Sequence, residues 1–301
     1  MTTASSESRS GVVAGVSAYL LWGILAVYFK IVREVGPLEI LAHRIVWAFA
    51  VLLITIAILR RGHLVIAILR QRRVMTLLAA STALIAVNWF IYIWSVTHDR
   101  MIESSLGYFI NPLVSVLLGF LVLGERLRGR EILSVALAAV AVVWLTASAG
   151  AFPWISTALA LTFAMYGLMR KLASVTAIEG LAIETALLLP LAAGYMIYRA
   201  QAGTLAFGHV SPALDAWLLA AGPLTATPLL LFAAAVRRLR LATVGLLQYI
   251  SPSMQFALAI AVYHEPFDQK RLVAFVLIWI AIAIYSTAGI GRSREDEKPP
   301  A

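Results

Sequence analysis

The sequence predicts an all-α integral membrane protein with ten transmembrane helices in two inverted repeats of five helices. Three observations lead to this prediction. The 301-residue chain is 61% hydrophobic and only 13% charged, with a mean hydropathy of +0.90. It contains ten apolar runs of roughly 20 residues, the length a helix needs to cross a bilayer. Segments about 140 residues apart also resemble each other.

The ten apolar runs follow one another with short polar connections. They are near-continuously apolar and lack the alternation of barrel strands, so the backbone must satisfy its own hydrogen bonds within helices. Their approximate bounds are 12–31, 38–59, 74–96, 104–123, 132–148, 152–169, 177–198, 216–236, 242–263 and 272–289.

The first run follows a polar leader, residues 1–10, which we expect to be cytoplasmic. A signal peptide is the alternative interpretation of this run. The run is long, contains Trp22 and Tyr28, and has no small-residue cleavage site before Lys30, so we expect it to be retained. The sequence has no cysteine, which excludes disulfides and thiolate metal sites, and its histidines lie mostly in or near loops. No metal site is expected.

Positive charge is concentrated in alternate connections. If the amino terminus is cytoplasmic, the inner segments hold 17 of the 24 Lys and Arg residues and the outer loops hold six, and Arg44 inside the second run is the remaining one. This imbalance follows the positive-inside rule and predicts a multi-pass protein with both termini in the cytoplasm. Topology therefore explains the net charge of +9, and no nucleic-acid partner is expected.

An internal repeat is visible between SLGYFINPLVSVLLGFLVLGE, which ends at Glu125, and GLLQYISPSMQFALAIAVYHE, which ends at Glu265. The same spacing aligns Arg44 with Glu184. Because five spans per half is an odd number, the second half must enter the membrane from the opposite side. We predict a first repeat over residues 11–148, a second over residues 149–290, and a cytoplasmic tail from 291 to 301. Inverted repeats are frequent in secondary transporters, although some channels share this plan.

His43 and Arg44 lie inside the second run. If the run begins at about Pro37, Arg44 lies roughly 10 Å deep at the helical rise. A cation at the bilayer centre costs at least about 2.5 kcal/mol on insertion scales. Arg44 either snorkels to the outer interface, or both residues face a hydrated cavity where a carboxylate or an anionic group of a solute neutralises the guanidinium.

Two carboxylates could neutralise Arg44, namely Glu103 at the outer start of the fourth run and Glu184 within the seventh. The inversion places Arg44 and Glu184 at different depths, so we expect an Arg44–Glu103 pair rather than an Arg44–Glu184 contact. A carboxyl buried in a membrane cavity favours its protonated form and can carry a proton across. Glu184 is therefore the candidate for proton coupling. The alternative is a structural carboxylate satisfied by neighbouring hydroxyls such as Thr185.

Aromatic and proline residues complete the candidate cavity. Trp22 in the first run, with Trp89 and Tyr92 on one face of the third, can hold the apolar body of a solute by stacking and cation–π attraction. Helix packing is the alternative role for these rings. Pro112 and Pro252 lie within the fourth and ninth runs, where a proline frees a carbonyl one turn earlier and kinks the helix. They are predicted to act as hinges.

The strings YLLWGILAVYFK, EILAHRIVW, NWFIYIW, ESSLGYFINPLVSVLLGFLVLGER, MYGLMRK, AIETALLLP and RLRLATVGLLQYISP resemble the RarD branch of the EamA transporters, within the drug/metabolite transporter superfamily. The likeness covers roughly residues 10–290. It implies a ten-helix inner-membrane permease made of two EamA-like halves, of a type linked to chloramphenicol sensitivity or resistance, and it implies no catalytic chemistry. It places the characteristic polar positions of the family on His43, Arg44, Asn88, Glu103, Tyr108, Asn111, Glu184, Gln248 and Tyr249.

Together these features predict a secondary-active permease or exporter of small amphipathic metabolites or drugs, working by alternating access between its halves. The expected partners are a small-molecule solute and the lipid bilayer. Transport is driven either by a proton gradient, with protons as the coupling ion, or by the gradient of the solute itself. The sequence contains no Walker-type phosphate loop and no paired catalytic groups in its spans, so neither a cofactor nor an enzyme activity is expected. A passive channel or facilitator for small solutes is the alternative.

Overall fold

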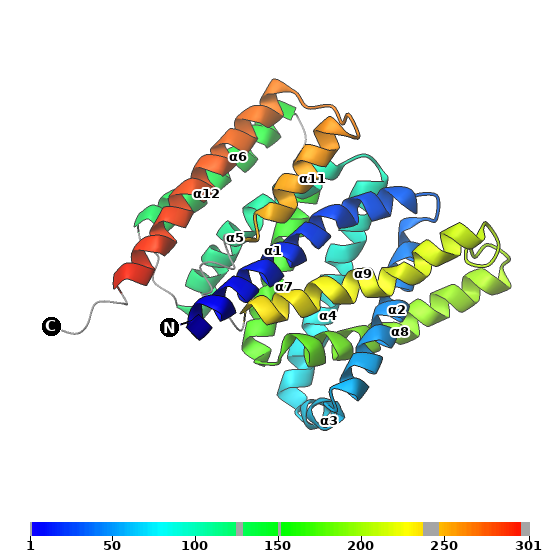
Figure 1. Cartoon of the computed structure of the whole chain (residues 1–301). Coiled ribbons are helices and arrows are strands. Elements are labelled where there is room, and N and C mark those ends of the chain that lie inside the picture. The colour runs from blue at the N-terminus through cyan, green and yellow to red at the C-terminus, as the bar shows by residue number, and fades with distance from the viewer. Residues whose placement is uncertain (1, 125–128, 150–151, 237–246, 296–301) are drawn as a thin grey trace.

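The computed structural model describes residues 2–124, 129–149, 152–236 and 247–295, and this part of the chain is all-helical (Figure 1). The all-α prediction is therefore confirmed. The helices are α1 (Thr2–Ile31), α2 (Pro37–Ile58), α3 (Gly62–Leu69), α4 (Arg72–Thr97), α5 (Met101–Leu123), α6 (Gly129–Ala149), α7 (Trp154–Ala173), α8 (Ala177–Gln201), α9 (Pro212–Val236), α11 (Ile250–Ala261) and α12 (Gln269–Glu295).

Each of the ten predicted runs coincides with one of these helices, and the short α3 lies in the connection between α2 and α4. Residues 242–246 of the ninth run lie outside the described residues. Among the described helices, α1, α2, α4, α5, α8 and α9 are long and apolar enough to cross a membrane, and α6 and α11 contain shorter apolar segments. The predicted leader is not a separate segment, because helix α1 begins at Thr2.

The long helices run between two ends of the bundle. Helix α1 begins and helix α12 ends on the same side, which we call the terminal end (Figure 1). At the opposite side, the distal end, the rings of Trp94 in α4 and Trp154 in α7 lie 5.7 Å apart. The hydroxyl of Ser156 there donates to the carbonyl oxygen of Glu103 in the first turn of α5. Thus α4 ends and both α5 and α7 begin at the distal end.

The first and second halves of the sequence interleave rather than forming separate bundles. Helix α1 packs on α9 and α11, helices α4 and α5 pack on α7, helix α2 packs on α8 and α9, and α6 packs on α12. One continuous cluster of buried apolar side chains runs through these contacts. A site in the middle of the bundle therefore receives side chains from both halves.

Two ion pairs join α2 and α8 at opposite ends. Glu39 in the first turn of α2 lies 3.3 Å from Arg199 near the end of α8, and it accepts a hydrogen bond from the amide of Ala206. Glu179 in the first turn of α8 lies 3.1 Å from Arg61, which follows α2. The two helices are therefore antiparallel. Each acid lies at a helix N-terminus, where the helix dipole favours negative charge.

Gly222 of α9 permits the close approach of α9 to α2. A Cβ atom there would lie 2.6 Å from the carbonyl oxygen of Trp47. Because backbone cannot rotate away, we expect Gly222→Ala to separate the helices and lower the thermal unfolding midpoint of the detergent-solubilised protein, with an overpacking cost of roughly 1–3 kcal/mol. Gly194→Ala in α8 is the matched control, since a Cβ there meets nothing within 4 Å. Equal midpoints for the two variants would contradict this packing.

Candidate functional site

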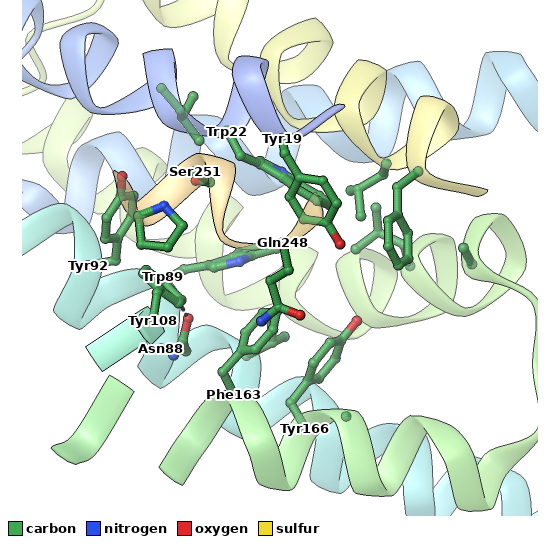
Figure 2. A pocket seen from close by; sticks show the side chains of 18 of the residues that line it. Tyr19, Trp22, Asn88, Trp89, Tyr92, Tyr108, Phe163, Tyr166, Gln248 and Ser251 are labelled. Atoms are coloured by element: carbon green, nitrogen blue, oxygen red, sulfur yellow. Dashed lines mark hydrogen bonds between the residues drawn. The ribbon is translucent and has the colours of Figure 1, made fainter. Parts of the chain in front are cut away.

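A cavity of about 360 Å³ lies in the middle of the bundle (Figure 2). This volume falls within the range of sites for small molecules. Its wall is built from α1, α2, α4, α5, α7, α8, α9 and α11, so both halves of the chain contribute to it. The aromatic side chains in its wall are Tyr19, Trp22, Trp89, Tyr92, Tyr108, Phe163, Tyr166 and Phe232.

The cavity extends from the centre of the bundle toward the terminal end. Arg170, three residues before the end of α7, and Ala177, the first residue of α8, both line it. On the distal side the lining reaches only Leu25 of α1 and Tyr92 of α4, more than one helical turn short of the ends of these helices. The cavity is therefore placed asymmetrically along the bundle.

Arg44 of α2 enters the wall of the cavity as a buried cation. It is 5% exposed, its Nε donates to the hydroxyl of Thr225 in α9 at 3.0 Å, and its guanidinium lies 4.2 Å from the ring centroid of Trp89. Its Nη1 has no hydrogen-bond partner, and no described carboxylate lies within ion-pair distance of it. Arg44 therefore does not snorkel to the interface. A guanidinium with an unused donor at a cavity is suited to an anionic guest.

The predicted Arg44–Glu103 pair is not formed. Glu103 lies in the first turn of α5, where its carboxylate is 3.7 Å from Arg100 and 3.9 Å from Arg271. That position at the distal end keeps the carboxylate partly solvated and next to the positive end of the helix dipole. Arg44, about two turns into α2, lies too deep to be reached from there.

Glu184 of α8 does not pair with Arg44 either. Its carboxylate is completely buried and accepts hydrogen bonds from the hydroxyls of Ser81, at 2.5 Å, and Tyr166, at 3.3 Å. Nη1 of Arg170 lies 3.6 Å away. The hydroxyl of Thr185 bonds to backbone carbonyls of α8 instead. Glu184 is not among the described residues in the wall, but Tyr166 and Arg170 touch both it and the cavity.

The cavity brings together a majority of the predicted solute-contacting residues. The members in its wall are Trp22, Arg44, Asn88, Trp89, Tyr92, Tyr108 and Gln248, together with the predicted hinge residue Pro252. The wall does not include His43, Glu103, Asn111, Tyr249 or the other predicted hinge residue, Pro112.

His43 lies on another face of α2 than Arg44, because consecutive residues of a helix point about 100° apart. Its Nδ1 accepts a hydrogen bond from Trp47, and its ring lies 5.1 Å from Phe207 in the α8–α9 connection. Tyr249, which precedes α11, stacks on Phe109 of α5. The expectation that His43 and Arg44 face one cavity together was therefore wrong for His43.

Asn88 holds three helices together at the wall. Its side-chain nitrogen donates to the carbonyl oxygen of Leu159 at 3.0 Å and to the hydroxyl of Thr162 at 2.9 Å. Its side-chain oxygen accepts from the hydroxyl of Tyr108 at 3.1 Å. Because all these hydrogen-bonding groups are used, Asn88 fixes α4 against α5 and α7 and positions the neighbouring Trp89.

The two predicted hinge prolines have different settings. Pro112 lies inside α5, as expected. Pro252 lies in the first turn of α11, where a missing N–H costs no helical hydrogen bond, so the expected mid-helix kink is not found there. The carbonyl oxygen of Pro252 accepts a hydrogen bond from Ser105 of α5 at 2.7 Å. This contact ties the start of α11 to α5 beside the cavity.

Several cavity residues were missed by the sequence analysis. The most important are Arg170 of α7 and Gln255 of α11. Thr225 of α9, which does not line the cavity but binds Arg44, was also missed. Arg170 was one of the 17 cations counted in the inner segments, because it follows an apolar run. The signal that could have found it is its spacing of four residues from Tyr166, which the internal repeat aligns with Trp22, because residues so spaced share a helix face.

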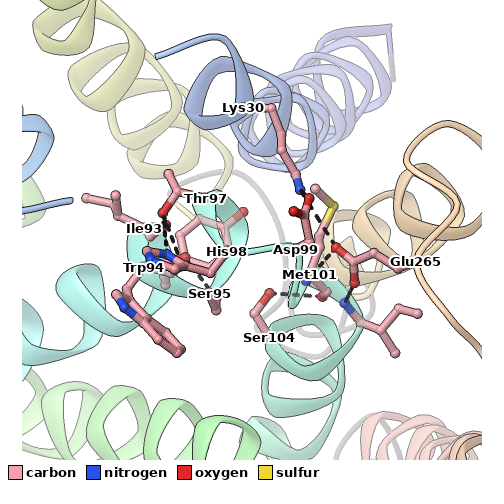
Figure 3. A network of polar contacts seen from close by, with 12 residues as sticks. Lys30, Ile93, Trp94, Ser95, Thr97, His98, Asp99, Met101, Ser104 and Glu265 are labelled. Atoms are coloured by element: carbon pink, nitrogen blue, oxygen red, sulfur yellow. Dashed lines mark hydrogen bonds and ion pairs between the residues drawn. The ribbon is translucent and has the colours of Figure 1, made fainter. Parts of the chain in front are cut away.

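A polar network closes the bundle at the distal end (Figure 3). Lys30 in the last turn of α1 bonds to Asp99 in the α4–α5 connection and lies 3.9 Å from Glu265, which follows α11. Glu265 accepts hydrogen bonds from the amides of Met101 and Ile102, both at 2.9 Å. These are the first two residues of α5, where free N–H groups favour an anion. We call Lys30, Asp99, Glu265 and the two amides the distal latch.

The members of the distal latch differ in exposure. The side chains of Lys30 and Glu265 are nearly buried, whereas that of Asp99 is 62% exposed. The hydrogen bond from Lys30 lowers the pKa of the Asp99 carboxyl below its usual value, with further lowering from the charges of Lys30, Arg33 and His98. Asp99 is therefore ionised at neutral pH, and the latch joins opposite charges.

This bundle of apolar helices around a solute-sized cavity is typical of a multi-pass membrane transporter, and the chain belongs to the EamA transporter family. Residues 9–147 match the EamA-like transporter family. The chain is 40% identical to the protein RarD of Escherichia coli K12, covering 98% of this chain and 99% of that protein. It is 42% identical to an uncharacterized transporter of Vibrio cholerae, covering 96% of each.

Two further comparisons extend this result. The chain is 28% identical to the chloramphenicol-sensitive protein RarD of Pseudomonas aeruginosa, covering 92% of this chain and 93% of that protein. A solved crystal structure that is 22% identical superimposes with a TM-score of 0.59 over 96% of this chain, which shows a shared fold. The resemblance to RarD proteins is confirmed, and the protein is a multi-pass membrane transporter rather than an enzyme.

Proposed function

We propose that the protein is a secondary-active permease that carries small amphipathic solutes across the bacterial inner membrane by alternating access. The observation that carries this proposal is the asymmetry of the cavity, which extends toward the terminal end while the latch joins the helices at the distal end. A carrier needs such a site between two gates, of which only one is open at a time. A passive channel would need an opening at both ends.

The proposal includes ten spans in two inverted five-helix repeats, residues 11–148 and 149–290. Under this repeat α1, α2, α4 and α5 correspond to α7, α8, α9 and α11. The packing of α1 on α9 then matches that of α4 on α7, and the packing of α1 on α11 matches that of α5 on α7. The same inverted repeat relates the Glu39–Arg199 ion pair to the Glu179–Arg61 ion pair.

Polar contacts inside the bundle support the same correspondence. Arg44 is hydrogen-bonded to Thr225, and its counterpart Glu184 is hydrogen-bonded to Ser81. The spacing between Ser81 and Thr225 is nearly the same as the spacing between Arg44 and Glu184. The repeat therefore relates the two hydrogen-bonded pairs to each other. Two halves that can exchange their conformations would convert a cavity open at one end into a cavity open at the other.

In this proposal the terminal end is cytoplasmic, because the positively charged connections expected inside lie there. The cavity is then accessible from the cytoplasm, and both termini are inside. Arg44 binds an anionic group of the solute, while Trp22, Trp89 and Tyr92 contact its apolar body. The helices that contain Pro112 and Pro252 move when the gates exchange. Drug-sized amphipathic molecules are candidate solutes, as the name of the Pseudomonas aeruginosa relative suggests.

The experiment that tests this function is counterflow in proteoliposomes. The solutes for this assay are first identified by thermal-shift screening of the purified protein against amino acids, nucleosides and antibiotics. A carrier is expected to show saturable uptake that is accelerated by the same solute on the opposite side. An open pore shows neither saturation nor counterflow, and this result would replace the permease by the passive facilitator.

Glu184→Gln is expected to separate proton coupling from solute movement. We propose that Glu184 carries the coupling proton, since its buried carboxylate contacts two residues of the cavity wall. The variant cannot exchange a proton at this position, so uptake driven by a proton gradient should be lost while counterflow continues. Glu103→Gln, at the partly exposed distal end, is the control. Normal gradient dependence in Glu184→Gln would remove the coupling role.

A further inference from the structure

The charges around the cavity do not balance. Two arginines, Arg44 and Arg170, lie in its wall, and the described wall residues include no aspartate or glutamate. A buried cation is stable only when an opposite charge or a full set of acceptors compensates it. Glu184 faces Arg170 from outside the wall, so Arg44 is the cation without a counter-charge, and an occupying solute can supply the missing negative charge.

Arg170 is placed where it can turn toward either of two anions. Its Nη2 donates to the carbonyl oxygen of Thr176 at 2.9 Å, which anchors one edge of the guanidinium. Its Nη1 lies 3.6 Å from Glu184 without a hydrogen-bond partner. That separation is too long for a hydrogen bond, so the attraction to Glu184 is electrostatic only. Nη1 is buried against α8 in this conformation, so an acidic group in the cavity can compete for this donor when the guanidinium turns toward the cavity.

Gly180 of α8 provides the space in which the guanidinium of Arg170 lies. A Cβ atom at Gly180 would be 1.5 Å from Nη1 and 2.2 Å from Cζ of Arg170. The obstructed atoms are the far end of a flexible side chain, so a larger residue would displace the guanidinium without moving the backbone. Gly180→Ala therefore relocates this charge while keeping it in the protein.

We propose that the solute is an organic anion with an apolar, planar body, and that Arg170 binds its acidic group in competition with Glu184. The proposal rests on the proposed function. Arg44 provides the second cationic contact for the same acidic solute, and the aromatic wall contacts the apolar body. When the solute takes Nη1 of Arg170, Glu184 loses the cation that faces it. A cationic solute meets two like charges and is excluded, although aromatic walls alone can attract cations.

The test uses sets of three molecules that share one aromatic body and carry a negative, a neutral or a positive terminal group. Phenylacetate, phenylacetamide and phenethylamine form one set, and indole-3-acetate, indole-3-acetamide and tryptamine form another. Thermal shift of the purified full-length protein identifies binders, and calorimetry measures their dissociation constants. At least one acid is expected to bind roughly tenfold or more tightly than its amide, a charge-assisted contact being worth at least one factor of ten. If no acid binds, or if an amide or amine binds equally well, the proposal is overturned.

Variants test the competition for Arg170. Arg170→Gln should weaken binding of the acid roughly tenfold and leave binding of the amide unchanged. Glu184→Gln should tighten binding of the acid, because the competing carboxylate is gone, and Gly180→Ala should change it while the net charge stays the same. Arg73→Gln, an exposed cation at the start of α4, is the control for net charge. A purely structural role of the Arg170–Glu184 contact predicts weaker binding in both glutamine variants, and this result would overturn the competition.

Failure of the organic-anion assignment can be distinguished from failure of the proposed permease function. If neutral or cationic solutes show saturable counterflow while the acids do not bind, the permease stands and the organic-anion assignment falls. If no solute shows counterflow, the permease itself is contradicted.

Discussion

Replacing Arg44 with glutamine is expected to abolish solute binding and counterflow while leaving the empty protein at least as stable as the unmodified chain. The guanidinium is buried, has no carboxylate partner among the described residues, and has an unused donor at Nη1. A buried charge without a counter-charge costs free energy, so its removal should raise or preserve the thermal unfolding midpoint. The same removal takes away the cation that binds the solute.

The comparison that isolates this effect is Arg44→Lys. The ammonium keeps the charge but lacks the planar fork and the stacking surface that Trp89 contacts at 4.2 Å, so we expect intermediate binding. Arg33→Gln, an exposed cation after α1, should leave both measurements unchanged. Unfolding of Arg44→Gln together with retained binding by any folded fraction would show that Arg44 has a structural role only.

Glu265→Gln is expected to open the distal latch. The carboxylate accepts two charge-assisted hydrogen bonds at the N-terminus of α5 and lies 3.9 Å from the buried Lys30. An amide can accept at only one of its two positions, and each lost hydrogen bond to a charged group costs about 1.5–3 kcal/mol. Hydrogen exchange at the amides of Met101 and Ile102 should therefore accelerate. Glu103→Gln, in the same turn of α5 but with a partly exposed carboxylate that does not accept from these amides, should leave this exchange slow.

The latch is not expected to be a pH switch. Because Lys30 lowers the pKa of Asp99, this pair contributes fully above the usual pKa of an aspartate and is lost only as pH falls through the lowered value. Titration of the Asp99 carboxyl should then show no protonation step between about pH 5 and 8. A loss of amide protection in Glu265→Gln that is no larger than in Glu103→Gln would contradict the latch.

The sequence predicted the helical architecture well because membrane spans are specified locally. A run of apolar residues needs no distant partner to form a helix in lipid, and each predicted run coincides with a described helix. The prediction differs from the structure at helix ends, because a continuous run of apolar residues does not show where a helix begins. Pro252 was placed mid-helix because the run around it is continuously apolar, whereas the described helix α11 begins at Ile250.

The site was predicted less completely, because helix rotation and depth are tertiary properties. Arg44 and His43 are adjacent in sequence, but α2 turns only Arg44 to the cavity. Glu103 was the expected partner of Arg44, yet the start of α5 keeps it with Arg100 and Arg271. Arg170 looked like a flanking cation, and only the packing of α7 against α8 brings it near Glu184.

The central claim is that one cavity is accessible from one face of the membrane at a time. The most direct test introduces Ser251→Cys, a near-isosteric change in the cavity wall of a chain that has no cysteine of its own. A membrane-impermeant maleimide is applied to the cytoplasmic or the outer face of sealed vesicles. The account predicts labelling from the cytoplasmic face, protection by bound solute, and a shift toward outer labelling when Glu265→Gln is added. Equal labelling from both faces of the Glu265-containing protein would indicate an open pore and contradict the account.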